Sequence, residues 1–340
     1  MSNSISVKEI SNTKFNGIIS SQLVLEIKGI NSIIANTLRR IVHDDIPIYG
    51  FPSELIQIEQ NTSTYNNDQI KDHLMQIPIL NIDSGLFYLD PMYWKDIDYK
   101  DLNRNKHPKE KTIELYVNIH NTTSENMFVT TDNAKIYING EIIDMWKDYK
   151  HKPVLMELKP DTIFKCHMKS ALGTGERNAI WSSGLAFPYA EGNDDKPDKI
   201  VFTLESFGQI NEYAILVKAC DYIIYKLTEL KKHIEKLITE GKISSKKTLI
   251  LELEDEDHTL GNVVNDVLQD HPNIIFSGVS KPDHLVKLIR LKIECDDKYP
   301  TPIEPIYQSI DKLKTIYNKI KSELNDLINK EPKNNKEGKK

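Results

Sequence analysis

The chain has 340 residues, 39% of them hydrophobic and 28% charged, so it is long enough for two or three globular domains. Its formal net charge of −6 argues against a free-standing nucleic-acid-binding protein, because such proteins are usually basic. There is no apolar run long enough for a membrane span and no apolar signal core at the polar N-terminus, and the separated Cys166, Cys220 and Cys295 form no zinc-ligand pattern. We therefore expect an intracellular protein without a metal site.

The first elements in chain order are a predicted strand and a predicted helix. Apolar residues recur at every second position, at Leu23, Leu25 and Ile27, which is the period of a half-buried strand. Asn31 then provides a side chain that can cap a helix, and apolar residues recur at helical spacing from Ile34 to Val42.

A long insertion follows this helix. About 150 residues separate it from the next predicted strand at 200–204, and they contain little long helix. Asn139-Gly140 is typical of a two-residue hairpin turn. Because loops tolerate inserted domains, we predict a mostly β domain inserted in the first domain. Its strand-like stretches are 55–58, 113–119 and 135–138.

Two long helices are predicted from apolar residues spaced alternately by three and four. The first covers 216–237 and follows the strand at 200–204, and the second covers 303–327 and follows a strand at 288–293. This period of about 3.5 is typical of helices that pack along one another. We expect the two helices to pack together within the protein, with Cys220 in the seam as a small hydrophobic residue.

The second half of the chain repeats the first strand and helix. A shift of 226 positions superposes residues 25–44 on residues 251–270 without a gap and places Gly261 on Ala35. An interior helix glycine costs about 1 kcal/mol relative to alanine. Because both residues are small, we expect the two helices to cross there about a pseudo-two-fold axis; the alternative is a tolerated surface glycine. The predicted dimer core is Ala35, Leu38, Ile41, Leu260, Gly261, Asn262 and Val264.

These patterns predict an α+β fold. Two tandem dimerisation domains, each a strand–helix–strand–helix unit, form an intramolecular pseudo-two-fold dimer, with a mostly β domain inserted in the first. In the second copy the connection that matches the insertion is short, roughly 271–284. The predicted boundaries are 1–46 and 198–240 for the first dimerisation domain, 47–197 for the insert, 241–247 for a linker, 248–330 for the second dimerisation domain and 331–340 for a disordered tail.

Motifs that carry chemistry are weak in this sequence. There is no GxxxxGK[ST], HExxH or GxSxG motif, and the glycine-rich segment 173–177 is followed by no clear helix, so it is a poor nucleotide site. The acidic run 252–257 lacks the spacing of a calcium loop. Its last acids instead favour the positive N-terminal end of the helix that follows.

Two further features point to partners. Arg39 and Arg40 fall on Asn265 and Asp266 of the second copy, so we expect the two helices to share an inner face and to differ on the outer one. A scaffold that offers distinct faces to distinct partners would have this pattern; the alternative is two solvated arginines near a helix C-terminus. Trp181 indicates a partner surface if it is exposed and ordinary core packing if it is buried.

Several segments resemble one known family. Residues 36–40 (NTLRR), followed by Ile-Pro at 46–47, resemble the NxLRR…P signature of the alpha-like subunits of multisubunit DNA-directed RNA polymerases. The segments 173–182 (GTGERNAIWS) and 205–208 (ESFG) are similar to two further motifs of these subunits. Residues 256–262 (EDHTLGN) resemble the small partner subunit, archaeal L or its eukaryotic equivalent. The resemblance covers about 20–330.

The resemblance implies that two normally separate subunits are fused, as in large nucleo-cytoplasmic DNA viruses. It implies a non-catalytic assembly scaffold that docks the second-largest and largest polymerase subunits and a small accessory subunit, without a membrane and without specific nucleic-acid contact. It further implies a location in the virion and the host cytoplasm or nucleus. The positions that match the family's docking residues are Asn36, Arg39, Arg40, Gly173, Gly175, Glu176 and Trp181.

The chain departs from the family in its insert. Some relatives hold zinc or an iron–sulfur cluster there, but residues 47–165 contain no cysteine, so we expect no metal and no cofactor. Two other functions stay open from the sequence alone. One is a stand-alone dimerisation module of another complex, and the other is an enzyme that binds a nucleotide through the loop 173–177.

Overall fold

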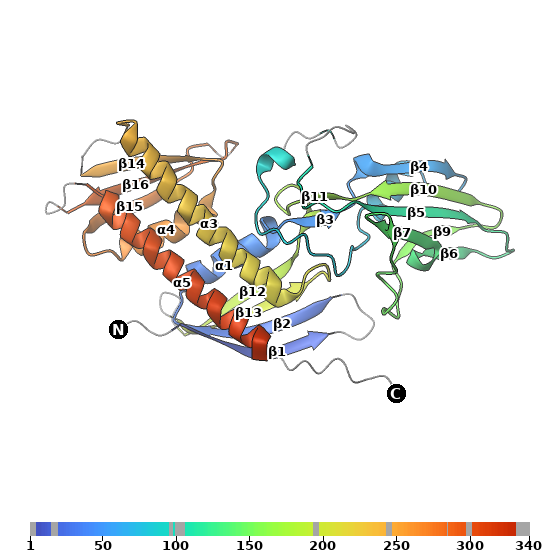
Figure 1. Cartoon of the computed structure of the whole chain (residues 1–340), viewed down its shortest axis with the longest axis horizontal. Helices are drawn as coiled ribbons and strands as arrows, with labels where there is room; N and C mark the ends of the chain where they lie inside the picture. Colours follow the sequence, from blue (N-terminus) through green and yellow to red (C-terminus); the bar gives the residue numbers. More distant parts are fainter. Residues whose placement is uncertain are drawn as a thin grey trace.

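The computed structural model describes residues 5–14, 20–94, 98, 106–192, 197–242, 247–283, 285–296 and 301–330. The predicted α+β class is confirmed, because these described residues combine five α-helices with sheets in which the paired strands are antiparallel. The molecule is elongated, with a three-stranded sheet at one end, a five-stranded sheet at the other and a four-stranded sheet between them (Figure 1).

The four-stranded sheet and its two helices form what we call the first unit. Its strand order is β1-β2-β13-β12, every neighbouring pair is antiparallel, and both helices pack against it. The inward positions of β2 are the predicted apolar ones, and Leu23, Leu25 and Ile27 are buried. The elements are β1 (Ser6–Lys14), β2 (Ser21–Lys28), α1 (Ser32–Asp44), β12 (Gly184–Gly192), β13 (Pro197–Ser206) and α3 (Glu212–Thr239).

The three-stranded sheet and its two helices form the second unit. Its order, β14-β16-β15, is that of β2-β13-β12 in the first unit, so the two units share one topology. The elements are β14 (Thr248–Glu254), α4 (His258–Gln269), β15 (Ile274–Ser280), β16 (Leu288–Cys295) and α5 (Ile303–Lys330).

Each unit contains an edge strand that the sequence pattern did not predict. We expected residues 184–192 in the insert and residues 271–284 in a connection, but β12 and β15 pair with β13 and β16. Apolar side chains on the solvent side of these strands, such as Phe187, Tyr189 and Ile275, obscure the alternation that marks a half-buried strand. The predicted insert boundary at 197 is therefore wrong, and the insertion ends before β12.

The two units share a single hydrophobic core. Helix α3 packs along α5, and α1 packs along α4, so that buried residues from Val7 to Leu324 form one continuous cluster. Figure 1 shows the two long helices side by side. Cys220 is fully buried in the seam between them, as expected from its place in the apolar repeat.

The residues between α1 and β12, which we call the inserted segment, have a second core of their own around Trp146 and Phe164. The five-stranded sheet has the order β4-β10-β5-β7-β8. Asn139 and Gly140 have positive φ angles of 51° and 87° in the β7–β8 turn, so the predicted hairpin is confirmed. The elements are β3 (Ile48–Gly50), η1 (Ser53–Leu55), β4 (Ile56–Asn61), α2 (Asn67–Leu74), η2 (Pro91–Tyr93), β5 (Ile113–His120), β6 (Met127–Thr130), η3 (Thr131–Asn133), β7 (Ala134–Ile138), β8 (Glu141–Ile142), β9 (Val154–Leu158), β10 (Ile163–Lys169), β11 (Ala171–Gly173) and η4 (Ala179–Trp181).

Two predicted segments fall wholly or partly outside the described residues. The predicted disordered tail, 331–340, is one of them, and positions 243–246 of the predicted linker are the other. Within the described ranges, none of the helices combines the length and the apolar composition that a membrane crossing requires.

Candidate subunit interface

Two polar contacts join α1 and α4, and each includes the residue that caps one of the helices. Asn31 caps α1 with its Oδ1 atom, and its Nδ2 atom donates a hydrogen bond of 2.6 Å to Asp266 Oδ2. Asp257 caps α4 with its Oδ1 atom, and its Oδ2 atom accepts a hydrogen bond of 2.5 Å from Arg40 Nη2. The shift of 226 positions places Asn31 on Asp257 and Arg40 on Asp266. The two contacts are therefore one contact made twice, as at a two-fold axis.

The ion pairs between α3 and α5 are related by a two-fold axis in the same way. Lys321 Nζ lies 2.5 Å from Asp221 Oδ1, and Lys231 Nζ lies 3.4 Å from Asp311 Oδ2. A shift of 90 positions places Asp221 on Asp311 and Lys231 on Lys321, and it carries the apolar seam of α3 onto that of α5. The two helices run antiparallel, since the earlier residue of each meets the later residue of the other. Both helix pairs thus have approximate two-fold symmetry.

Gly261 does not lie at the crossing of α1 and α4, which corrects our expectation. A Cβ atom there would lie 2.7 Å from Ile289 Cδ1 and 3.1 Å from Val279 Cγ1, both on the sheet of the second unit. The glycine therefore allows α4 to approach its own sheet. Asn262, predicted in the dimer core, is exposed, and its neighbour Val263 is buried instead. The core positions Ala35, Leu38, Ile41, Leu260 and Val264 are all buried.

Charged side chains from both units and from the inserted segment meet beyond the C-terminal end of α1. They line a cavity of about 210 Å³. Lys287 Nζ lies 2.5 Å from Glu176 Oε1 and so connects the second unit to the inserted segment. Lys226 pairs with Glu256 and connects α3 to the second unit. These ion pairs, with Arg40–Asp257, join three parts of the chain at one place.

Asp45 lies at this junction and is an unusual carboxyl group. Burial raises the pKa of Asp45 to about 7, although the hydrogen bond of 2.8 Å from Tyr222 Oη opposes that effect. The carboxylates of Glu176 and Asp44 raise the pKa of Asp45 further. The position also follows α1, whose C-terminal end carries partial negative charge.

Most of the glycine-rich segment that we predicted for docking is used inside the chain. Trp181 is only 2% exposed, its ring covers Gly173, and its Nε1 atom donates a hydrogen bond of 3.0 Å to the carbonyl of Ala171. A Cβ atom at Gly175 would collide with the backbone of His43. Of the two alternatives for Trp181, ordinary core packing therefore holds, and Gly173, which also matches a docking position, is buried beneath its ring. Gly173 and Gly175 thus serve close packing within the chain, which gives no support to a nucleotide site in this segment.

Arg39 and Arg40 have different surroundings, although they are adjacent. The Nε atom of Arg39 donates a hydrogen bond of 2.8 Å to Asn36 Oδ1 on the exposed side of α1. Arg40 pairs with Asp257 across the two units, so its predicted place on the outer face is wrong. Among the predicted docking residues, Asn36 and Glu176 are exposed and Arg39 is partly exposed.

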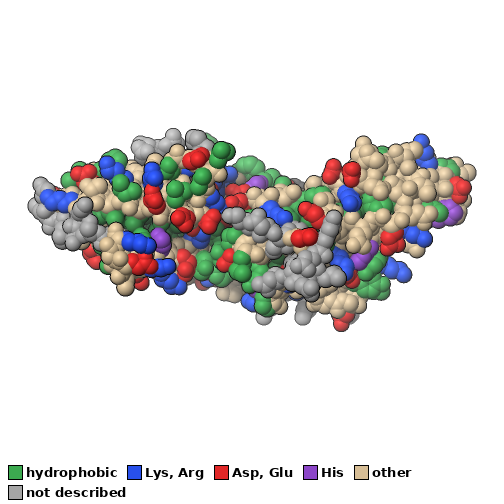
Figure 2. All heavy atoms as spheres, turned by 90° about the horizontal axis from the view of Figure 1, so that it is seen from above, with side chains coloured by type: hydrophobic (Ala, Val, Ile, Leu, Met, Phe, Trp, Pro, Cys, Tyr) green, Lys and Arg blue, Asp and Glu red, His purple; other side chains and the backbone are tan. Residues whose placement is uncertain are grey.

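The surface offers few other signs of chemistry. Acidic and basic side chains are intermingled over the face shown in Figure 2. Among the described residues, no group of three or more His, Cys, Asp or Glu side chains could hold a metal ion. Burial raises the pKa of the Cys166 thiol to about 12, so this cysteine is an inert core residue.

Two comparisons with known proteins match the second unit. Residues 248–323 match the family model described as the RNA polymerase Rpb3/Rpb11 dimerisation domain. The DNA-directed RNA polymerase subunit Rpo11 of Sulfurisphaera tokodaii is 31% identical over 84 residues, which are 25% of this chain and 89% of that subunit. The chain belongs to the Rpb3/Rpb11 family of RNA polymerase subunits.

A third comparison extends over both units and the inserted segment. A protein of Acanthamoeba polyphaga mimivirus, named as a DNA-directed RNA polymerase subunit, R470, is 29% identical over 329 residues. The match covers 90% of this chain and 89% of that protein. The family that the sequence resembles is thereby confirmed.

Sequence reasoning missed the polar residues that join the units. The sequence placed Asp257 in the acidic run before a helix and Asp266 at the counterpart of Arg40, but it identified neither as a contact residue. The signal was present, because the 226-residue shift pairs Asn31 with Asp257 and Arg40 with Asp266. An antiparallel crossing of the two helices then brings each cap to the far end of the other helix. Lys287 and Asp45 gave no comparable signal.

Proposed function

We propose that this chain is the alpha-like assembly scaffold of a multisubunit RNA polymerase and carries both halves of the family's dimer in one polypeptide. The observation that supports this proposal is the pair of two-fold-related contacts, Asn31–Asp266 and Arg40–Asp257. Contacts of this kind are typical of a dimer interface between equivalent surfaces. Here the two surfaces belong to the first and the second unit.

The scaffold role requires a surface that stays free when the units are paired. We propose the exposed side of α1, with Asn36 and Arg39, as the docking surface for the second-largest subunit, after which the largest subunit binds. Glu176 lies at the junction of both units and the inserted segment, where it pairs with Lys287. A subunit that docks beside Glu176 would therefore bind more tightly when the two units are paired. Arg40 serves the pairing itself.

The proposed role is non-catalytic. Supporting it, the charged side chains of the cavity beyond α1 are used between parts of the chain: Arg40, Lys226 and Lys287 each pair with a carboxylate, and Asp45 accepts the hydrogen bond from Tyr222. The similarity to a mimivirus protein supports a viral transcription complex. We keep the virion and the host cytoplasm or nucleus as the predicted locations of that complex.

A co-purification experiment tests the proposal. The tagged chain would be expressed with the second-largest and largest polymerase subunits of the same genome, and partners would be identified by mass spectrometry. We expect recovery of both large subunits and template-dependent RNA synthesis in the eluate. Arg39→Glu reverses the charge of the proposed docking surface, so it should release the second-largest subunit without changing the melting temperature of the isolated chain.

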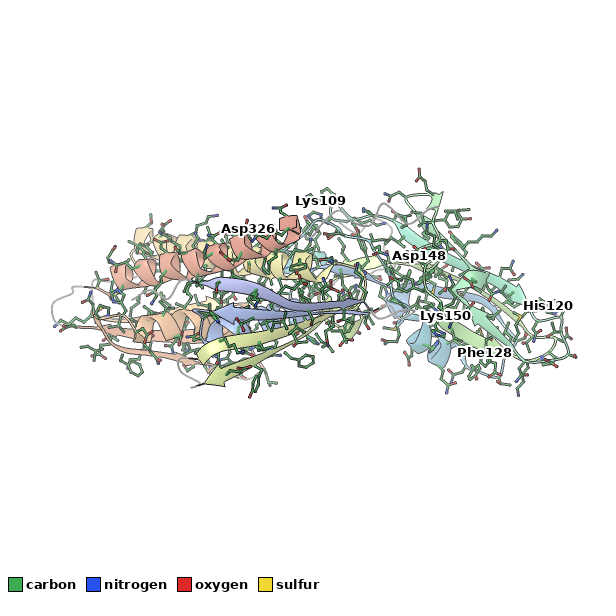
Figure 3. The ribbon with its side chains drawn as sticks, turned by 90° about the horizontal axis from the view of Figure 1, so that it is seen from below. Lys109, His120, Phe128, Asp148, Lys150 and Asp326 are labelled. Carbon is green, nitrogen blue, oxygen red and sulfur yellow. The ribbon has the colours of Figure 1, made fainter. Side chains whose placement is uncertain are left out.

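The matched control is Lys150→Glu, the same charge change at an exposed position of the inserted segment that Figure 3 shows far from Asp326 of α5. It should leave recovery unchanged. Loss of both large subunits from the wild-type eluate would reject the scaffold and favour a dimerisation module of another complex. Full recovery with Arg39→Glu would place the docking surface elsewhere.

A further inference from the structure

The two helix pairs share one symmetry but differ in how they would respond to a wrong partner. If a unit paired with a second copy of itself, the same two-fold symmetry would bring together residues that are now apart. This comparison rests on the proposed function, in which the packed units are the two halves of a dimer.

Helices α3 and α5 do not discriminate between partners. Each carries one acid and one base at equivalent places, Asp221 and Lys231 on α3 and Asp311 and Lys321 on α5. Two copies of α3 would bring Asp221 to Lys231 twice, and two copies of α5 would bring Asp311 to Lys321 twice. These charges therefore favour every combination of units equally.

Helices α1 and α4 do discriminate. Two copies of the second unit would bring Asp257 of each copy to Asp266 of the other, so that two contacts between carboxylates replace the contacts with Arg40 and Asn31. Two copies of the first unit would bring Arg40 to Asn31, which places no like charges together. The combination of one first unit with one second unit makes both observed hydrogen bonds and brings no two carboxylates together.

The surroundings of Asp266 make a like-charge contact costly. Burial raises the pKa of Asp266, and the nearby Asp270 raises it too, while the hydrogen bond from Asn31 and the charge of Lys312 oppose these effects. This carboxylate is already partly removed from water. A second carboxylate at the same place would therefore be screened less than at an exposed site.

Asp257 has a local role, since it caps α4, whereas Asp266 caps neither α1 nor α4. It lies within α4 at the position where α1 has Arg40. Its contact is the cross-unit hydrogen bond from Asn31. We infer that Asp257 and Asp266 are specificity-determining residues that prevent the second unit from pairing with another second unit and so direct it to the first.

The test uses the full chain with a protease site placed between Lys242 and Lys247 and cleaved after folding, so that the units start as a packed complex. Cleaved chains with and without ¹⁵N are mixed at the urea concentration at which wild-type first and second units exchange. Native mass spectrometry then distinguishes first–second, first–first and second–second pairs by mass. Exchange itself is visible as first–second pairs of hybrid mass.

Wild-type chains should give hybrid first–second pairs and almost no second–second pairs. Asp266→Arg keeps the Arg40–Asp257 contact but turns both like-charge contacts of a second–second pair into attractive ones, so second–second pairs should rise about tenfold. Asp326→Arg makes the same charge change at an exposed position of α5 and should behave like the wild type.

Equal amounts of second–second pairs in wild-type and Asp266→Arg chains, or the same rise with Asp326→Arg, would reject the inference alone. Wild-type units that separate and never re-form first–second pairs would reject the paired arrangement and the inference with it. The co-purification experiment reads docking rather than pairing, so the two proposals fail in distinguishable ways.

Discussion

The first and the second unit have the same order of strands and helices, yet equivalent positions serve different contacts. Ala35 and Gly261 occupy the same place in α1 and α4, and the absence of a side chain at Gly261 lets α4 approach Ile289 and Val279. Asp45 and His271 are likewise equivalent, but the first is a carboxyl group at a crowded junction and the second is near the surface. Apolar spacing therefore sets the topology, and a few polar or small residues set what each unit contacts.

The largest effect should come from the seam that both units share. Leu227 on α3 and Tyr317 on α5 are equivalent and fully buried. Replacing either with alanine leaves a cavity, so Leu227→Ala and Tyr317→Ala should each lower the free energy of unfolding by about 3 kcal/mol. Ile238→Ala, near the exposed end of α3, should change it by less than about 0.5 kcal/mol.

Hydrogen exchange would show whether the seam joins the units thermodynamically. We expect amides of α1 and α4 to lose protection together in both seam variants, because one core spans both units. A variant in which the amides of α1 lose protection while those of α4 keep it would show that the two units unfold independently.

The contact of α4 with its own sheet should respond next. Gly261→Val would push methyl groups into Ile289 and Val279, and we expect a loss of about 2 kcal/mol in urea unfolding. Gly261→Ala should cost much less, because the flexible end of Ile289 can move and alanine gains about 1 kcal/mol of helix propensity. Equal losses for valine and alanine would contradict the close approach. At the equivalent position, Ala35→Gly should cost about 1 kcal/mol.

Asp45 should make stability depend on pH. The unfolded chain releases this proton near the ordinary pKa of 3.8 and the folded chain near 7, so the folded state binds the proton more tightly between these values. The stability that the protonated Asp45 contributes is therefore lost as the pH rises from about 4 to about 7. Asp45→Asn cannot ionise and still accepts the hydrogen bond from Tyr222.

At pH 8 the Asp45→Asn variant should be more stable than the wild type by about 2 kcal/mol, and near pH 4 the two should be alike. Thermal unfolding at a series of pH values measures this difference. Asp148→Asn, at an exposed carboxyl group of the inserted segment that Figure 3 labels, serves as the control and should show no such trend. A pH-independent effect of Asp45→Asn would mean that the junction tolerates the charged form.

The smallest effect concerns the polar contacts between units. A double-mutant cycle with Arg40→Ala and Asp257→Asn should give a coupling of about 0.5–1 kcal/mol, because the pair is only partly exposed and asparagine preserves the helix cap. The coupling should weaken in 1 M salt. The more open Lys231–Asp311 pair should couple less, and the reverse order would show that the α3–α5 charges are the stronger link.

Much of the fold could be predicted because it follows apolar periodicity. The four helices α1, α3, α4 and α5 and the strands β2, β13, β14 and β16 each bury one face, and their spacing records it. The edge strands β12 and β15 could not be predicted, because each exposes apolar side chains on its solvent side. The boundary of the inserted segment was misplaced for the same reason, since it depends on β12.

The candidate site was less predictable, because periodicity shows which face is buried but not what covers it. Gly261 has the pattern of a helix–helix contact and lies instead against a sheet. Trp181 matches a docking motif and is core. Arg39 and Arg40 are adjacent, so their side chains point about 100° apart around the helix axis. As a result Arg39 lies on the exposed side of α1, whereas Arg40 contacts the second unit.

The chain passes from the end of α3 at Thr239 to the start of β14 at Thr248 through one short connection. The association of the two units, which would otherwise need two molecules, is therefore intramolecular. Its rate and its equilibrium do not depend on how much protein the cell has made, since the effective concentration is set by the connection. Translation also produces the two units in equal number. Neither unit is therefore made in excess with its apolar face exposed to solvent.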